Sequence, residues 1–202
     1  MRASTRTLAS AAALLAAAAL TAAPAAANPT AAAEAKKPAA ERPAPNDKVA
    51  RGRYIVSTAG CHDCHTPWHM GPNGPEPDMS RALSGHPQDL AMPPAPKMGD
   101  GPWAVAIAAT NTAYAGPWGV SYTANLTPDP DSGLGRWTVE DFKATIRTGR
   151  RAGRGREILP PMPIMVYNNM TDQDLEAIYA YLRTLPAVRN RVPEPRAPQA
   201  AN

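Results

Sequence analysis

Two cysteines separated by two residues, with a histidine directly after the second, constrain this chain more than any other feature. They are Cys61, Cys64 and His65. On one turn of helix both thiols project to the same side, and the histidine follows closely. This spacing is typical of the attachment site of a c-type haem, in which both sulfurs form thioethers and the histidine ligates the iron. The sequence predicts one covalent haem c per chain, because it contains one such motif.

Three other uses of the cysteine pair compete with haem attachment. A redox disulfide of the thioredoxin type needs a βαβ context, which the Pro/Gly-rich surroundings do not indicate. A zinc site would use Cys61, Cys64, His65 and His69, but zinc modules usually separate their ligand pairs by about a dozen residues. A structural disulfide between the two cysteines would close a very small loop and would stabilise little. Haem attachment leaves neither thiol unused and is the interpretation we adopt.

The N-terminal segment indicates export. Residues 1–27 contain Arg2 and Arg6, then an Ala/Leu run, and end in three alanines that fit the small-x-small pattern of a signal-peptide cleavage site. The apolar run is shorter than the about 20 residues of a transmembrane helix, although an uncleaved N-terminal anchor is the alternative. We therefore expect a periplasmic protein with no transmembrane segment in the mature chain. Haem attachment outside the cytoplasm agrees with this expectation.

Two Pro/Ala-rich segments flank what we expect to be a single domain at residues 47–190. Residues 28–46 lack aromatic side chains and predict a flexible linker, and residues 191–202 predict a disordered tail. Removing Arg2 and Arg6 with the signal lowers the formal net charge from +4 to +2. With so small a charge on an exported chain, no nucleic-acid partner is expected.

Three helices are expected in the domain. The first covers residues 47–60 and leads into the cysteine motif, with Gly52 small enough for another helix to cross closely. The second covers residues 138–148 after an N-cap at Thr138, and the last covers residues 172–185 after an N-cap at Thr171.

Large apolar side chains are few in this sequence, which contains one Phe. We therefore expect the haem to complete the core and the haem-free chain to fold poorly.

From about residue 49 to residue 186 the chain resembles the class I c-type cytochromes. It shares with them the helix before the haem motif, a late methionine loop and a closing helix that ends in Tyr181-Leu182. It is most similar to bacterial cytochrome domains of periplasmic dehydrogenase systems, which carry an Asn-Leu-Thr-Pro-Asp segment, here 125–129, and a Pro-Pro-Met-Pro segment, here 160–163. The resemblance implies a mainly α fold with three or more helices around the covalent haem and long Pro/Gly-rich loops.

The resemblance also implies an axial methionine opposite His65, and Met162 is the residue that matches. Its flanking prolines restrict the loop, as a weak thioether ligand requires. Met165 and Met170 lack this frame. His86 is a rival ligand from the long loop, with a histidine on the loop surface as the ordinary alternative. The predicted haem-binding residues are Cys61, Cys64, His65 and Met162, of which His65 and Met162 ligate the iron.

Residues 66–136 form an insertion relative to a minimal cytochrome, with turn signals at 72–74 and 131–133 and an apolar run at 105–109 that predicts a strand or a helical turn. The insertion either shields the haem edge from water or only enlarges the protein surface.

Trp137 either donates a hydrogen bond to a haem propionate or fills the core. A cluster of five arginines either steers an acidic redox partner, neutralises propionates or forms a solvated loop. Its members are Arg147, Arg150, Arg151, Arg154 and Arg156.

Together these features predict a periplasmic one-electron carrier with His/Met axial ligation, and not an enzyme. Its partners would be redox proteins, with a dehydrogenase as electron donor and/or a terminal oxidase as acceptor. Two alternatives stay open at this point. One is a fixed electron-transfer subunit of a periplasmic dehydrogenase. The other is a haem peroxidase, which would need an open sixth position on the iron.

Overall fold

The computed structural model describes residues 47–97 and 101–198. The predicted signal peptide at 1–27 and the predicted linker at 28–46 lie outside these residues. Every helix in the described part of the chain is too short or too polar to cross a membrane.

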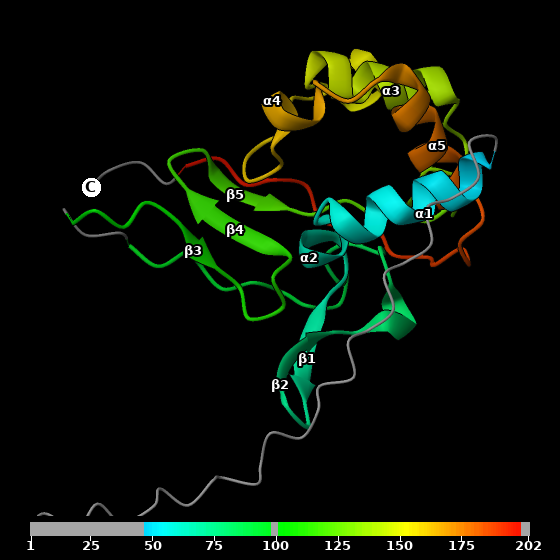
Figure 1. Ribbon diagram of the computed structural model, residues 1–202. Coiled ribbons are helices and arrows are strands. Elements are labelled where there is room, and N and C mark those ends of the chain that lie inside the picture. Colours follow the sequence, from blue (N-terminus) through cyan, green and yellow to red (C-terminus); the bar gives the residue numbers. More distant parts are fainter. Residues whose placement is uncertain (1–46, 98–100, 199–202) are drawn as a thin grey trace, which may run out of the picture. The chain divides into compact units, whose positions relative to one another are not determined.

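Two helices that lie far apart in the sequence cross closely and form the centre of the helical part (Figure 1). They are α1 at Lys48–Thr58 and α5 at Asp172–Leu182. Gly52 makes the crossing possible, because a Cβ at this position would lie 1.9 Å from the carbonyl oxygen of Ala177. The prediction that another helix crosses at Gly52 is therefore confirmed.

A separate short helix carries the cysteine motif. This helix, α2, runs Cys61–His65 and begins directly after Gly60. Gly60 adopts a left-handed conformation with φ of 75°, which glycine reaches without steric cost. The chain therefore changes direction before the first cysteine, and the helix predicted over 47–60 ends at Thr58.

The helix expected over residues 138–148 has the predicted ends. This helix, α3, runs Val139–Thr148, and Thr138 and Asp141 form a capping box at its start. Gly149 closes it in a left-handed conformation. The last helix, α5, ends earlier than expected, because residues 184 and 185 tighten into i→i−3 hydrogen bonds.

Three further helical turns complete the helical part. α4 runs Ile164–Tyr167 directly after the methionine loop and was not indicated by the sequence. Two 3-10 turns, η1 at Met79–Arg81 and η2 at Arg151–Gly153, lie in the insertion and after α3.

Two antiparallel sheets occupy the insertion at 66–136. β1 (Trp68–Gly71) and β2 (Gly74–Pro77) form a hairpin around the predicted turn at 72–74. β3 (Ala106–Ile107), β4 (Ala113–Gly116) and β5 (Gly119–Tyr122) form a second sheet in that order. The apolar run at 105–109 thus contains a two-residue strand at its centre. The helices agree with the expected class, but a mainly α description omits these sheets.

Residues 191–198, which belong to the predicted disordered tail, lie against β5. The backbone N–H groups of Arg196 and Val120 donate to each other's carbonyl oxygens, both at 2.9 Å. The Arg196 guanidinium also donates to the carbonyl oxygens of Met92 and Pro93, at 3.4 and 3.0 Å. Gly119 leaves room, because a Cβ there would lie 2.1 Å from the Arg196 carbonyl oxygen. Composition misses this arrangement, since the tail pairs with the backbone of β5 instead of forming a core of its own.

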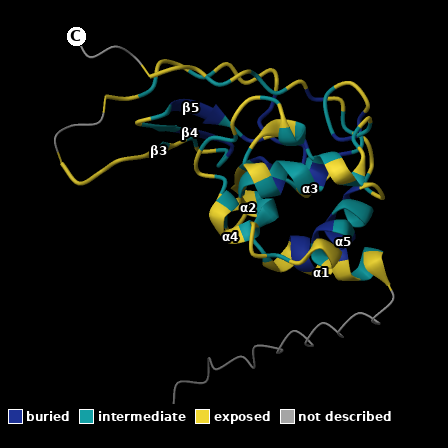
Figure 2. Cartoon of the chain, turned by 90° about the horizontal axis from the view of Figure 1, so that it is seen from above, coloured by how far each residue is buried: buried dark blue, intermediate teal, exposed yellow. Residues whose placement is uncertain are grey.

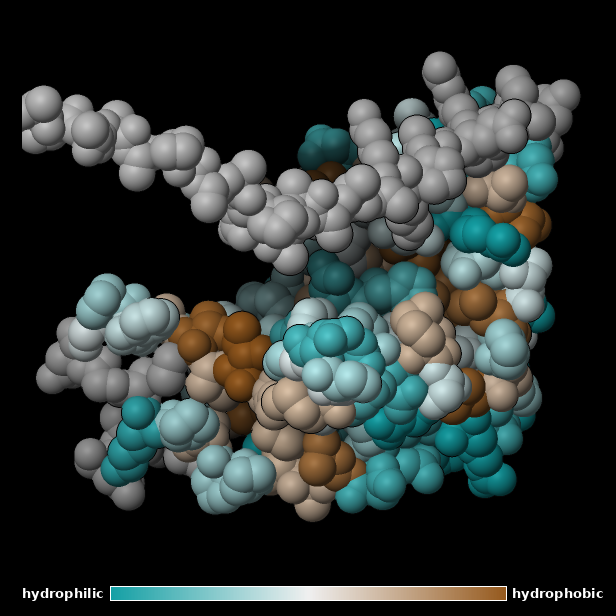
Figure 3. Space-filling view, turned by 60° about the horizontal axis from the view of Figure 1, so that its bottom comes forward, coloured by the Kyte–Doolittle hydropathy of each residue, from teal (hydrophilic) through white to brown (hydrophobic). Residues whose placement is uncertain are grey.

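The buried core lies between α1, α3, α5 and the loops beside them, as the dark blue segments in Figure 2 show. Val56, Leu175 and Leu182 are each 1% exposed, and Phe142 joins them from α3. Leu83, fully buried in the same cluster, comes from the insertion. Because of Leu83, the insertion is part of the same core as the helices. The surface in Figure 3, in contrast, mixes polar (teal) and apolar (brown) side chains.

Gly52→Ala is expected to destabilise the haem-loaded protein by about 1–3 kcal/mol, the usual penalty for overpacking. Alanine is otherwise favoured over glycine inside a helix by about 0.5–1 kcal/mol, so a loss would come from the contact with α5. Urea unfolding measures the difference. Gly101→Ala is the control, because a Cβ there meets no atom within 4 Å. Equal stability of Gly52→Ala and the wild type would contradict the close crossing.

Candidate functional site

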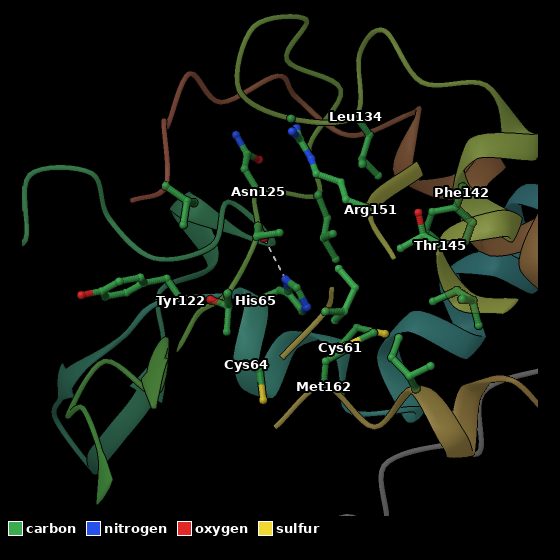
Figure 4. A pocket seen from close by; sticks show the side chains of 18 of the residues that line it. Cys61, Cys64, His65, Tyr122, Asn125, Leu134, Phe142, Thr145, Arg151 and Met162 are labelled. Carbon is green, nitrogen blue, oxygen red and sulfur yellow. Dashed lines mark hydrogen bonds between the residues drawn. The ribbon is translucent and has the colours of Figure 1, made fainter. Parts of the chain in front are cut away.

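A cavity of about 410 Å³ opens between the helices and the loops (Figure 4). Its wall is formed by α2, by the segment 121–126 that begins in β5, by α3 and α5, by the methionine loop at 158–163 and by the tail at 191–194. The volume lies within the about 300–1,000 Å³ that is typical of cofactor and small-molecule sites. The four predicted site residues all line this cavity: Cys61, Cys64, His65 and Met162.

His65 is buried and is held in one tautomer. Its Nδ1 lies 2.8 Å from the carbonyl oxygen of Ala124, the bond drawn as a dashed line in Figure 4. Since a carbonyl oxygen can only accept, Nδ1 carries the proton and Nε2 keeps a free lone pair, as a metal ligand must. Burial lowers the pKa of the imidazole, and the hydrogen bond to Ala124 opposes this shift only in part. The ring is therefore neutral at pH 7. No sequence pattern indicates Ala124, because any residue supplies a carbonyl group.

The two cysteines are free thiols at the cavity wall. Burial raises the pKa of the Cys61 thiol to about 11. Redox-active Cys-x-x-Cys pairs depend on a lowered thiol pKa, so this environment does not favour thiol–disulfide chemistry. The Tyr114 hydroxyl lies 3.1 Å from Cys64 Sγ and 2.8 Å from the Asn111 carbonyl oxygen, which fixes the second cysteine against β4.

The zinc interpretation is not supported by the arrangement of possible ligands. Within residues 47–97 and 101–198, no three His, Cys, Asp or Glu side chains gather so as to hold a metal ion. His69 points to Glu76 across the β1–β2 hairpin, at 3.6 Å, and both side chains are about half exposed. His62 instead shares a hydrogen bond of 2.9 Å with Thr66.

His86 is neither an iron ligand nor a surface histidine. It is fully buried, with Nδ1 2.9 Å from Thr112 Oγ1 and Nε2 3.1 Å from the Leu90 carbonyl oxygen. Its ring packs against Tyr122 with 4.8 Å between the ring centroids. The sequence interpretation of a loop-surface histidine is therefore wrong, because the insertion has a buried polar interior that its composition does not reveal.

The three candidate methionines differ in their positions. Met162 lines the cavity and packs against the buried core. Met165, on α4, is 88% exposed and points away from the core. Met170 also lines the cavity, just before α5. The structure thus separates Met162 from Met165, and the proline frame around Met162 distinguishes it from Met170.

The arginine cluster is mostly neutralised within the domain. Arg147 pairs with Asp172 at 2.6 Å, Arg154 with Asp141 at 3.0 Å and Arg156 with Glu194 at 3.2 Å. Arg151 lines the cavity with its guanidinium 5.7 Å from the centroid of the Trp137 ring. Because three of the five arginines have carboxylate partners, the cluster is not an open basic patch.

Comparison with known proteins decides the family. The family model described as "Cytochrome c" matches residues 49–186. The chain belongs to the cytochrome c family. The match covers the four predicted site residues and, apart from Lys48 at the start of α1, the three long helices.

Several curated relatives are cytochrome subunits of bacterial dehydrogenases. The cytochrome is 30% identical over 146 residues to the fructose dehydrogenase cytochrome subunit of Gluconobacter japonicus, covering 72% of this chain and 22% of the relative. It is 29% identical over 133 residues to the cytochrome c subunit of alcohol dehydrogenase (quinone) of Gluconobacter oxydans, with coverages of 66% and 20%. It is 39% identical over 65 residues to the gluconate 2-dehydrogenase cytochrome c subunit of Pantoea cypripedii, with coverages of 32% and 14%. The chain thus spans about a fifth or less of the length of these relatives.

Family membership means a covalently bound haem c with its iron, and the cavity fits such a group. The wall is apolar on the side of α3 and α5, while Arg151 lines it elsewhere and would neutralise carboxylate charge of a haem. Thr123 adds an independent observation: its hydroxyl is buried at the cavity wall and has no hydrogen-bond partner among the described residues. Buried hydroxyls normally have a partner, so the group that fills the cavity is expected to provide one.

Cys61→Ala and Cys64→Ala are each expected to weaken or abolish covalent haem attachment, because each removes one thioether. Acid-acetone extraction measures the fraction of covalently attached haem, since the treatment removes non-covalent haem and leaves tethered haem on the protein. His65→Ala is expected to impair tethering and to leave the iron five-coordinate or misligated. Complete extraction of haem from the wild-type protein would contradict the attachment site.

Proposed function

We propose that this cytochrome transfers single electrons as the cytochrome component of a periplasmic dehydrogenase system. In this function Cys61 and Cys64 would tether the haem, and His65 and Met162 would ligate its iron. The observation that carries the proposal is that these four side chains, from two segments about a hundred residues apart, line one cavity with the His65 imidazole neutral and its Nε2 free. A bound haem supplies a reversible one-electron couple.

The residues around the cavity set the conditions for that couple. The apolar side chains of α3 and α5 exclude water, which disfavours the extra charge of the oxidised iron and raises the reduction potential. His65 and Met162 as axial ligands act in the same direction, because a thioether supports the reduced iron better than a second imidazole does. These features suit an acceptor for electrons from a dehydrogenase.

Three observations favour a docked component over a carrier that is steered by charge over long distances. The named relatives are cytochrome subunits of dehydrogenases. The arginine cluster is largely ion-paired, so it contributes little to long-range steering. Directly after the methionine loop, Met165 and Val166 are 88% and 63% exposed and offer an uncharged contact surface close to the cavity. A haem peroxidase has less support, since Met162 would occupy the sixth position and the relatives are not catalytic subunits.

Affinity purification of the tagged cytochrome from the periplasm tests the proposed function. The expected result is co-purification of a larger dehydrogenase whose substrate reduces the haem, as followed in the visible spectrum. A variant with Met165→Glu and Val166→Glu should lose the partner while keeping its haem spectrum, because two buried charges oppose an apolar contact. Reduction by a dehydrogenase without stable association would favour the diffusing carrier. Turnover of peroxide with the sulfur-ligation band intact would contradict a pure electron-transfer role.

Met162 substitutions should change iron ligation in a graded way. Met162→Ala is expected to open the iron to cyanide or peroxide, whereas Met162→His is expected to keep six-coordination and lower the reduction potential, because imidazole is a stronger donor than a thioether. The measurements are the weak long-wavelength absorption band of sulfur-to-iron ligation and a redox titration.

Met165→Leu and Met170→Leu are the matched controls and should both keep the sulfur-ligation band. Met170→Leu is the sharper of the two, because Met170 also lines the cavity. Loss of the band in Met170→Leu with retention in Met162→Ala would transfer the ligand assignment to Met170.

A further inference from the structure

The methionine loop has few bonds to the rest of the domain. Pro160, Pro161 and Pro163 have no N–H group to donate. The Met162 carbonyl oxygen accepts only locally, from the N–H of Ile164 at 2.9 Å. In the part of the chain that the structure describes, the Ile158 N–H at the start of the loop donates to the Gly149 carbonyl oxygen at 2.8 Å, and one further hydrogen bond joins the loop to another segment. That bond runs from the Ser121 hydroxyl to the Pro160 carbonyl oxygen, at 2.5 Å.

Ser121 is itself held firmly. It lies in β5 opposite Tyr114 of β4 and is 6% exposed. The Trp118 indole N–H donates to its Oγ at 3.2 Å, so the oxygen already accepts a hydrogen bond from the sheet. The hydroxyl has one proton, and the Pro160 oxygen at 2.5 Å is much closer than the Tyr114 carbonyl oxygen at 3.4 Å. The Ser121 proton is therefore directed at the methionine loop.

We propose that Ser121 is a positioning residue for Met162, through which the three-stranded sheet of the insertion strengthens the bond between the methionine and the iron. The proposal rests on the proposed role of Met162 as sixth ligand. A thioether binds iron weakly, so the fraction of molecules with the bond formed depends on how firmly the loop is held. Groups that orient a metal ligand from behind typically change metal affinity by about 10–100-fold when they are removed. Here the orienting group lies in β5 of the three-stranded sheet.

Imidazole binding to the oxidised haem-loaded protein is the direct test, because imidazole competes with the methionine for the iron. Ser121→Ala is expected to bind imidazole about tenfold more tightly than the wild type, the lower end of the range for such orienting groups. Its sulfur-ligation band should persist in the absence of imidazole. Ser121→Thr keeps the hydroxyl and should restore imidazole binding to near the wild-type level.

Thr110→Val is the matched control. It also removes a hydroxyl from the insertion, one that shares a 2.8 Å hydrogen bond with Thr112, but Thr110 does not line the cavity. It should lower stability without changing imidazole affinity. If Ser121→Ala yields no haem-loaded protein, Trp118→Phe replaces it, since it removes the N–H that orients the Ser121 oxygen. That variant should bind imidazole at least about twofold more tightly, as expected for one weakened hydrogen bond.

The outcomes separate this proposal from the assignment of Met162. Unchanged imidazole affinity in Ser121→Ala, or an equal increase in Thr110→Val, would overturn the positioning role while Met162 remained the ligand. Retention of the sulfur-ligation band in Met162→Ala would instead overturn the ligand assignment on which the proposal rests.

Discussion

The apolar core of this domain is at the same time the wall of its haem cavity. Seven of the nine residues of the buried hydrophobic cluster also line the cavity, among them Phe142, Leu175 and Leu182. An apolar wall without a partner loses dispersion contacts or is wetted by solvent. Folding and cofactor binding are therefore linked, because a group that binds only the folded chain stabilises it by mass action. The small number of large apolar side chains has the same explanation, since the haem provides much of the apolar contact surface.

The insertion at 66–136 contributes to the core and to the wall of the cavity. Leu83 enters the core, His86 ties together a buried polar interior, and Ala124 at the end of the insertion's sheet fixes the tautomer of His65. Through β5 the same sheet contacts the two segments that close the cavity, the methionine loop at Pro160 and the C-terminal tail at Arg196. One small sheet thus supports both sides of the iron site.

Most arginines of the cluster form ion pairs within the domain. The Arg147 ion pair joins α3 to α5, the Arg154 ion pair joins the segment after η2 to α3, and the Arg156 ion pair joins the residues before the methionine loop to Glu194 in the tail. Exposed ion pairs of this kind contribute little to stability individually, so their main effect is to cancel charge near the cavity rim. Arg151, directed at the cavity, keeps its charge for the carboxylates of the haem. Such a surface suits a partner that docks by contact.

The sequence by itself determined the local features. The Cys61–His65 motif, the caps at Thr138 and Thr171 and the turn at 72–74 were all predicted and found, because each depends on residues a few positions apart. The space at Gly52 was predicted as well, because the missing side chain is visible in the sequence, although the helix that crosses there lies far along the chain. The family and its cofactor could also be inferred from these segments. Only the tertiary structure decided which backbone oxygen holds His65, which hydroxyl holds the methionine loop, that His86 is buried and that the tail pairs with β5. The physical reason is that each of these contacts uses a backbone carbonyl or N–H group on at least one side, and backbone groups leave no pattern in the side chains.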